Sequence, residues 1–146
     1  VGSEMCIRDR VDSEQIEWFS KFSKSFPEYI SYKGMVQYDK SVEVLKDYFL
    51  LAFPTMFYTE GIPGTILDAY AAGLPVLASK WESFDDVIDD GETGIGYEFE
   101  NLKSLVNSLE LICNDPQIII NMKRFCIEKA NKYSPNQVIM NLIRQF

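Results

Sequence analysis

The chain has 146 residues, of which 47% are hydrophobic, so it is long enough for one domain with a buried core. It carries 14 Lys and Arg against 22 Asp and Glu, and the net charge of −8 excludes general electrostatic attraction to nucleic acid or to an anionic membrane surface. It has no His, which excludes Ser–His and Cys–His catalysis and His-ligated zinc.

The first ten residues differ in character from the rest of the chain. They show no hydrophobic periodicity and no helix-capping pattern, and they match the translation of a transposase-type sequencing adaptor codon by codon. We interpret residues 1–10 as adaptor translation and exclude them from the fold. On this interpretation the native sequence starts at Val11, and the part upstream of it is missing.

The rest of the chain alternates between helical and strand patterns. A capping box at Asp12 and Gln15 opens a helix that Pro27 stops. Pairs of a cap residue and a proline, Asp115–Pro116 and Ser134–Pro135, open the last two helices. In chain order, the patterns predict a helix at 12–26, a strand at 30–33, a helix at 41–48, a strand at 49–53, a helix at 63–72, a strand at 75–79, a short helix at 84–88, a strand at 95–99, and helices at 102–112, from 116 and from 135.

The predicted strand at 49–53 is a continuous apolar run, and the predicted strand at 75–79 is apolar up to Ser79, so neither shows polar alternation. Such runs are typical of parallel strands that are buried on both faces. Strands that alternate with helices through short loops indicate an α/β fold with a Rossmann-like, doubly wound parallel sheet.

Several other side chains are assigned to packing and turns. The helical patterns place Cys113, Cys126, Met122 and Phe125 in the core. Acidic pairs at 85–86 and 89–90 are expected to serve in turns and caps, since no third ligand follows at the spacing of a metal site.

The loop between the strand at 49–53 and the next helix carries the candidate chemistry. In an open parallel sheet, ligands bind beyond the carboxyl ends of the strands. The helix start offers unpaired amides and a partial positive charge that suit a phosphate, and Gly61 and Gly64 leave those amides accessible. Glu60 precedes the helix, and Asp68 lies one turn into it. A tight Gly-Pro turn with two solvated acids explains the spacing equally well.

The order of motifs resembles one known family. Matching segments are Tyr32–Val36, Phe53–Thr55, Glu60–Pro63, Asp68–Ala69, Ala72–Val76 and Asp90–Gly94. Together they resemble the C-terminal, donor-binding domain of family 4 (group 1) glycosyltransferases, which have the GT-B fold. The resemblance implies that residues 11–146 are a partial nucleotide-sugar (donor) binding domain that lacks its first strands.

The resemblance also implies a reaction. Members are retaining transferases that move a hexosyl unit from a nucleotide-diphospho-sugar to a glycan or lipid-linked acceptor. They bind no metal in this domain, and no other cofactor is implied. The resemblance therefore predicts a nucleotide sugar and the missing N-terminal acceptor-binding domain as partners, and a fragment that is inactive alone.

Site residues carry over position by position. Glu60 takes the place of the catalytic acid that binds donor-sugar hydroxyls. Asp68 takes the place of the ribose-binding acid, one methylene shorter than the Glu of the family pattern. Gly34 and Val36 would lie near the base. The diphosphate and sugar would be held by the segment Gly61, Ile62, Pro63, Gly64 and Thr65.

Two other functions stay open. A nucleotide-sugar epimerase shares the fold, although such enzymes commonly use a His in this half and the chain has none. A non-catalytic α/β binding module is the third reading, and it predicts that removing Glu60 leaves activity intact. The sequence shows no signal peptide and no apolar run long enough to span a membrane, so we expect a cytoplasmic protein, with the missing domain as a route to peripheral membrane contact.

Overall fold

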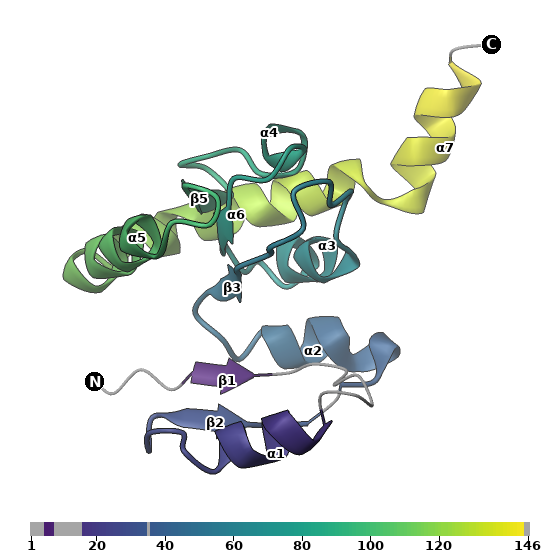
Figure 1. The fold of residues 1–146 in the computed structure, drawn as a ribbon. Coiled ribbons are helices and arrows are strands. Elements are labelled where there is room, and N and C mark those ends of the chain that lie inside the picture. The colour runs from purple at the N-terminus through teal and green to yellow at the C-terminus, as the bar shows by residue number, and fades with distance from the viewer. Residues whose placement is uncertain (1–4, 8–15, 35, 145–146) are drawn as a thin grey trace. The chain divides into compact units, whose positions relative to one another are not determined.

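The computed structural model describes residues 5–7, 16–34 and 36–144, and Figure 1 shows their elements. The chain divides into two compact units, residues 1–40 and 41–146.

The first unit contains one short parallel ladder. β1 (Met5–Ile7) pairs with β2 (Ile30–Tyr32), and α1 (Ile16–Ser23) and the 3₁₀ turn η2 (Tyr38–Lys40) complete the unit. The helix predicted at 12–26 ends three residues early, because the amides of Ser25 and Phe26 bond back to Phe22 and Ser23 as turns. Its predicted start at 12–15 lies outside the described residues. β1 falls in the segment interpreted as adaptor, and the boundary at Val11 stays a prediction.

The second unit holds a three-stranded parallel sheet in the order β3-β4-β5. Leu51 pairs with Val76, and Val76 pairs with Gly94. This arrangement confirms the predicted α/β, Rossmann-like class. In chain order the elements are α2 (Ser41–Leu45), β3 (Leu51–Phe53), α3 (Gly64–Ala71), β4 (Val76–Ser79), α4 (Phe84–Val87), β5 (Gly94–Tyr97), α5 (Leu102–Asn114), α6 (Gln117–Lys132) and α7 (Pro135–Ile143).

The core of this unit lies on both faces of the sheet. Along β4 the buried side chains alternate, so Val76 and Ala78 join one apolar cluster and Leu77 joins the other. The first cluster packs against α3 and α4, and the second contains Ile112 of α5 and Ile119 of α6. Two covered faces are the signature of a doubly wound sheet, and β4 is buried at every position, as predicted.

β3 differs from its prediction. It is shorter than 49–53, Ala52 is exposed, and Leu51 and Phe53 are only half-buried. Within the described residues β3 pairs on one side only, with β4. A strand at a sheet edge has fewer neighbours on either face, which is why its apolar sequence is not matched by full burial.

The helix ends follow local signals with small shifts. α3 begins at Gly64, so Pro63 is the N-cap and not the first helical residue. Gly73, with a φ of 70°, is the left-handed residue that ends this helix. Ser134 precedes Pro135 at the start of α7, as predicted.

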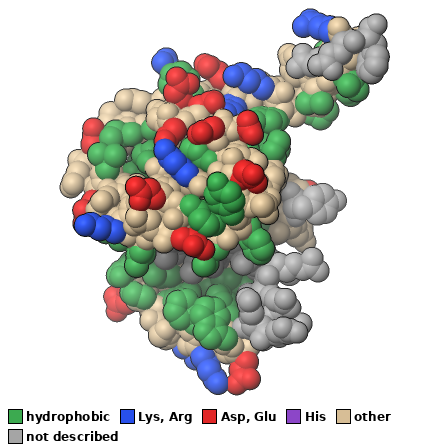
Figure 2. All heavy atoms as spheres, turned by 45° about the horizontal axis from the view of Figure 1, so that its top comes forward, with side chains coloured by type: hydrophobic (Ala, Val, Ile, Leu, Met, Phe, Trp, Pro, Cys, Tyr) green, Lys and Arg blue, Asp and Glu red, His purple; other side chains and the backbone are tan. Residues whose placement is uncertain are grey.

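The described residues lack two features that mark membrane or nucleic-acid binding. No helix in the described ranges combines the length and apolarity needed to cross a bilayer. On the face seen in Figure 2, acidic and basic side chains are interspersed among apolar ones. A continuous basic stripe, the usual footprint of nucleic-acid binding, is not seen among the coloured residues of that face.

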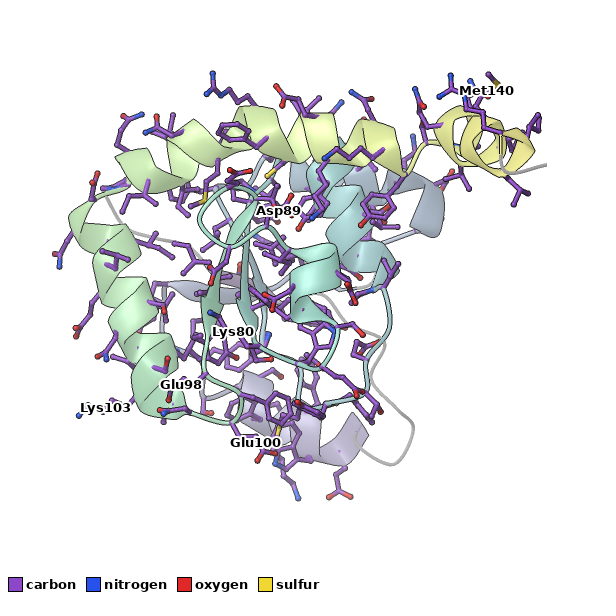
Figure 3. All side chains as sticks on the ribbon, turned by 90° about the horizontal axis from the view of Figure 1, so that it is seen from above. Lys80, Asp89, Glu98, Glu100, Lys103 and Met140 are labelled. Carbon is purple, nitrogen blue, oxygen red and sulfur yellow. The ribbon has the colours of Figure 1, made fainter. Side chains whose placement is uncertain are left out.

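A polar network holds the turn before β5. The Tyr70 hydroxyl donates to the Val87 carbonyl at 3.0 Å and lies 3.1 Å from Thr93 Oγ1, which accepts from the Asp89 amide. Burial raises the pKa of Tyr70, so its proton stays in place as a donor. The buried Lys129 of α6 pairs with Asp89 at 2.8 Å, and Figure 3 shows Asp89 beside that helix. The 89–90 acidic pair lies in a turn, as predicted, because the Asp89 carbonyl accepts from the amides of Glu92 and Thr93.

The cysteine predictions are half right. Cys126 is fully buried on α6, and its thiol lies 3.5 Å from the Thr93 carbonyl. Cys113, predicted in the core, is exposed near the end of α5. The two positions have the same helical pattern in sequence, but α5 turns Cys113 away from the sheet and buries Ile112 instead. Met122 is buried, and Phe125 is only half-buried.

This difference predicts selective alkylation. Burial raises the pKa of the Cys126 thiol to about 12, so it stays protonated and covered at pH 8. Iodoacetamide should therefore label Cys113 in the native protein and reach Cys126 only in urea. Peptide mapping by mass spectrometry separates the two sites. Equal labelling rates in native buffer would contradict the burial of Cys126.

Candidate functional site

The loop from Pro54 to Pro63 is fixed at the carboxyl edge of the sheet. The Ser79 hydroxyl, at the end of β4, donates to the Thr55 carbonyl at 2.8 Å. The Glu82 amide donates to the Tyr58 carbonyl at 2.9 Å, and the Tyr58 ring packs edge-on against Phe99 with centroids 5.3 Å apart. The segments that follow β3, β4 and β5 therefore meet here, at the edge where ligands bind in open α/β sheets.

A hollow of about 300 Å³ lies in this loop and is lined by Phe57, Thr59, Glu60 and Gly61. A tight turn shapes it, because the Glu60 amide donates to the Phe57 carbonyl at 3.2 Å. Glu60 is half-buried, while Gly61 is exposed. The hollow therefore offers one carboxylate beside an aromatic ring and a glycine backbone.

The start of α3 follows directly. The Pro63 carbonyl accepts from the amides of Ile66 and Leu67, at 3.0 and 3.4 Å, and no side chain caps the helix. Within the described residues, the Gly64 and Thr65 amides consequently have no protein acceptor. A Cβ built on Gly64 would meet nothing within 4 Å, so this helix start is open to solvent. Exposed amides at a helix N-terminus attract anions.

Asp68 lies one helical turn further along α3 and is half-buried. Its Oδ2 accepts a 2.6 Å hydrogen bond from the hydroxyl of Ser41, the first residue of α2. This contact joins residues that are 27 positions apart and holds the carboxylate in one orientation.

The two predicted base-proximal residues belong to the other unit. Gly34 has a φ of 74°, and Gly34 and Val36 are half-buried in the unit of residues 1–40. Glu60 to Asp68 belong to the second unit. The predicted role of Gly34 and Val36 near the base stays a prediction.

The aromatic residues near this edge have separate roles. Trp81 is buried and packs against Phe53 and Phe84. Tyr58 is exposed and anchors the loop on Phe99. Sequence reasoning passed over Phe57, Thr59 and Ser41. Phe57 could have been found from its position three residues before Glu60 in the same loop. No local feature of the sequence links Ser41 to Asp68.

Lys80 follows β4, but its charge is paired with an acid and is not free to bind an anion beside the open amides. Its Nζ pairs with Asp90 at 2.7 Å, and this hydrogen bond raises the pKa of Lys80. Figure 3 shows Lys80 lying over the strands. In the part of the chain that the structure describes, no group of three Cys, Asp or Glu side chains is arranged to hold a metal ion.

Comparison with solved structures identifies the class of fold. The Anabaena protein HepE, in a crystal structure with UDP and glucose, matches 98% of this chain and is covered over 41% of its own length, at 14% identity and a TM-score of 0.76. Sucrose-phosphate synthase from Thermosynechococcus elongatus matches 97% of the chain and is covered over 37%, at 16% identity and a TM-score of 0.77. The fold is the Rossmann-like half of a GT-B glycosyltransferase.

Sequence comparison gives the family. The Campylobacter jejuni N,N'-diacetylbacillosaminyl-diphospho-undecaprenol alpha-1,3-N-acetylgalactosaminyltransferase is 24% identical over 105 residues, which are 72% of this chain and 27% of that protein. An uncharacterized glycosyltransferase of Haemophilus influenzae is 27% identical over 89 residues, 60% of the chain and 24% of that protein. The chain spans about a quarter of the length of these curated relatives. The family Glycosyl transferases group 1 matches residues 9–115, and the chain belongs to this family.

Proposed function

We propose that this chain is the donor-binding part of a retaining glycosyltransferase of family 4. The complete enzyme, in which the chain is joined to an acceptor-binding half, transfers a hexosyl unit from a nucleotide-diphospho-sugar to a glycan or lipid-linked acceptor. The chain alone transfers no sugar, because the acceptor site lies in the other half. Peripheral contact with a membrane, where it occurs, is made by that half.

One observation carries the proposal. Glu60 lines a hollow in the loop at the carboxyl edge of the sheet, and four residues later the same segment enters the helix start with the open amides of Gly64 and Thr65. A carboxylate accepts hydrogen bonds from hydroxyls, and helix-start amides hold phosphate oxygens. A nucleotide-diphospho-sugar carries both groups on neighbouring atoms. Similar structures were determined in complex with UDP and glucose or with UDP-glucose, which supports this ligand class.

The roles of the residues follow from this placement. Glu60 binds hydroxyls of the donor sugar and acts as the catalytic acid residue of the site. The backbone from Gly61 through Ile62 and Pro63 to Gly64 and Thr65 holds the diphosphate and sugar. Asp68 binds the ribose hydroxyls while Ser41 orients its carboxylate. Neither a metal ion nor another cofactor takes part in this domain.

The experiment is a titration of the complete enzyme with UDP, UDP-glucose, GDP and GDP-mannose by isothermal calorimetry. Binding of UDP and UDP-glucose, or of GDP and GDP-mannose, supports the proposal. Binding of none of the four ligands overturns it. NMR of the product shows whether the transferred sugar keeps the anomeric configuration it had in the donor, which separates retaining transfer from inverting transfer. Epimerised sugar nucleotide in the absence of acceptor would favour the epimerase.

Gly64→Ala tests the open amides. The added methyl group meets no protein atom, so the thermal midpoint should stay within about 2 °C of wild type. It does stand where the diphosphate would approach the backbone, and nucleotide affinity should fall about three- to tenfold. Calorimetric titration with UDP measures this change. Unchanged affinity would place the diphosphate elsewhere.

Asp68→Glu tests the ribose role. The longer acid restores the family pattern, so donor affinity should be kept or improved in the complete enzyme. Asp68→Asn, which keeps the shape but removes the charge, should weaken UDP binding about tenfold, the scale of one charge-assisted hydrogen bond. A large loss of affinity in Asp68→Glu would contradict the assignment. Ser41→Ala should move affinity in the same direction as Asp68→Asn, by less.

A further inference from the structure

Phe57 is a large apolar side chain held in the open beside a carboxylate. It is 74% exposed, and it stacks on no other aromatic ring among the described residues. Its neighbour Tyr58, by contrast, packs on Phe99. The backbone on both sides of Phe57 is fixed, because its amide donates to Thr55 Oγ1 at 3.1 Å and its carbonyl accepts from the Glu60 amide.

The hollow that Phe57 shares with Thr59, Glu60 and Gly61 has a defined chemistry. The hollow is shallow and open to solvent, and its volume of about 300 Å³ is at the small end of ligand pockets. An aromatic face attracts polarised C–H groups through its negative quadrupole. A hexopyranose presents C–H groups on its ring faces and hydroxyls around its rim. The Glu60 carboxylate accepts from such hydroxyls, whereas it would repel a phosphate.

We infer that Phe57 is a specificity-determining residue that stacks on the hexose ring of the donor while Glu60 binds that ring's hydroxyls. This inference rests on the proposed function and extends it to the contact that selects the sugar. Phe57 contributes to binding of the sugar and not of the nucleotide. The turn from Phe57 to Glu60 brings both residues to the lining of one hollow.

The experiment compares ligands with and without the sugar. Complete enzyme carrying Phe57→Ala is titrated calorimetrically with UDP, UDP-glucose, GDP and GDP-mannose. Of these ligands, the nucleotide and nucleotide sugar that the wild type binds are compared. The affinity of the variant for the nucleotide sugar should be about three- to tenfold lower than that of wild type, and its affinity for the nucleotide should stay within about twofold of wild type. Phe57→Tyr, which keeps the ring, should retain wild-type affinity. Met56→Ala is the matched control, because Met56 is equally exposed at 75% but does not line the hollow.

Saturation-transfer NMR gives a second readout, since irradiation of aromatic protons should label the hexose ring protons in wild type and lose that label in Phe57→Ala. Equal loss of affinity for nucleotide and nucleotide sugar would mean that the ring contacts the nucleotide, and would overturn the inference. So would unchanged affinity for both ligands in Phe57→Ala, or a loss as large in Met56→Ala. A wild type that binds neither nucleotides nor nucleotide sugars overturns the proposed function, and this inference with it.

Discussion

Glu60→Gln is expected to lower the turnover of the complete enzyme about ten- to a hundredfold. A charge-assisted hydrogen bond to a sugar hydroxyl contributes roughly 1.5–3 kcal/mol, which corresponds to this factor when the bond acts mainly in the transition state. Gln keeps the shape of the side chain and removes the charge. Folding should change little, because no salt bridge or side-chain hydrogen bond of Glu60 is recorded among the described residues.

Steady-state rates of donor consumption and thermal melts of both proteins measure the two effects. Glu92→Gln is the control, since Glu92 is an exposed acid in the turn before the amino end of β5, at the opposite edge of the sheet. It should keep full turnover. A Glu60→Gln enzyme that melts earlier but turns over at the wild-type rate would make Glu60 a structural residue, and it would favour the non-catalytic binding module.

Gly94→Ala is expected to destabilise the chain by about 3 kcal/mol or more. Gly94 pairs with Val76 in the ladder between β4 and β5. A Cβ at Gly94 would lie 2.3 Å from the Val76 carbonyl oxygen and 3.1 Å from Ile88. The obstacle is the backbone of a fully buried strand and not a flexible side chain, so the strands must separate. Overpacking of buried sites typically costs about 1–3 kcal/mol even where side chains can move.

Urea unfolding of the full chain, followed by far-UV circular dichroism, measures this loss. Gly64→Ala serves as the matched control, because the same added methyl group there meets no atom within 4 Å. The control should unfold at the wild-type urea concentration. Loss of any cooperative transition in Gly94→Ala is the extreme form of the expected result. A midpoint equal to that of the control would show that β4 and β5 can part at little cost.

The predictions that succeeded from sequence rest on neighbours along the chain. Pro135 can start a helix but cannot continue one, and Gly73 adopts a left-handed conformation that ends one. The run at 75–79 is apolar up to Ser79 and shows no polar alternation, which favours a strand with both faces covered, and β4 is one. These signals predicted the parallel Rossmann-like sheet and placed the Glu60 loop at its carboxyl edge.

Tertiary structure decided what depends on residues far apart in the chain. The sequence pattern treated Cys113 and Cys126 alike, and only the packing of α5 and α6 on the sheet exposed one and buried the other. The apolar run of β3 was no guide to burial, because burial depends on which elements lie beside the strand. Ser41 reached Asp68 only through the packing of α2 on α3. Local conformational preferences are encoded within a few residues, whereas the partner of a side chain is set by the folded chain as a whole.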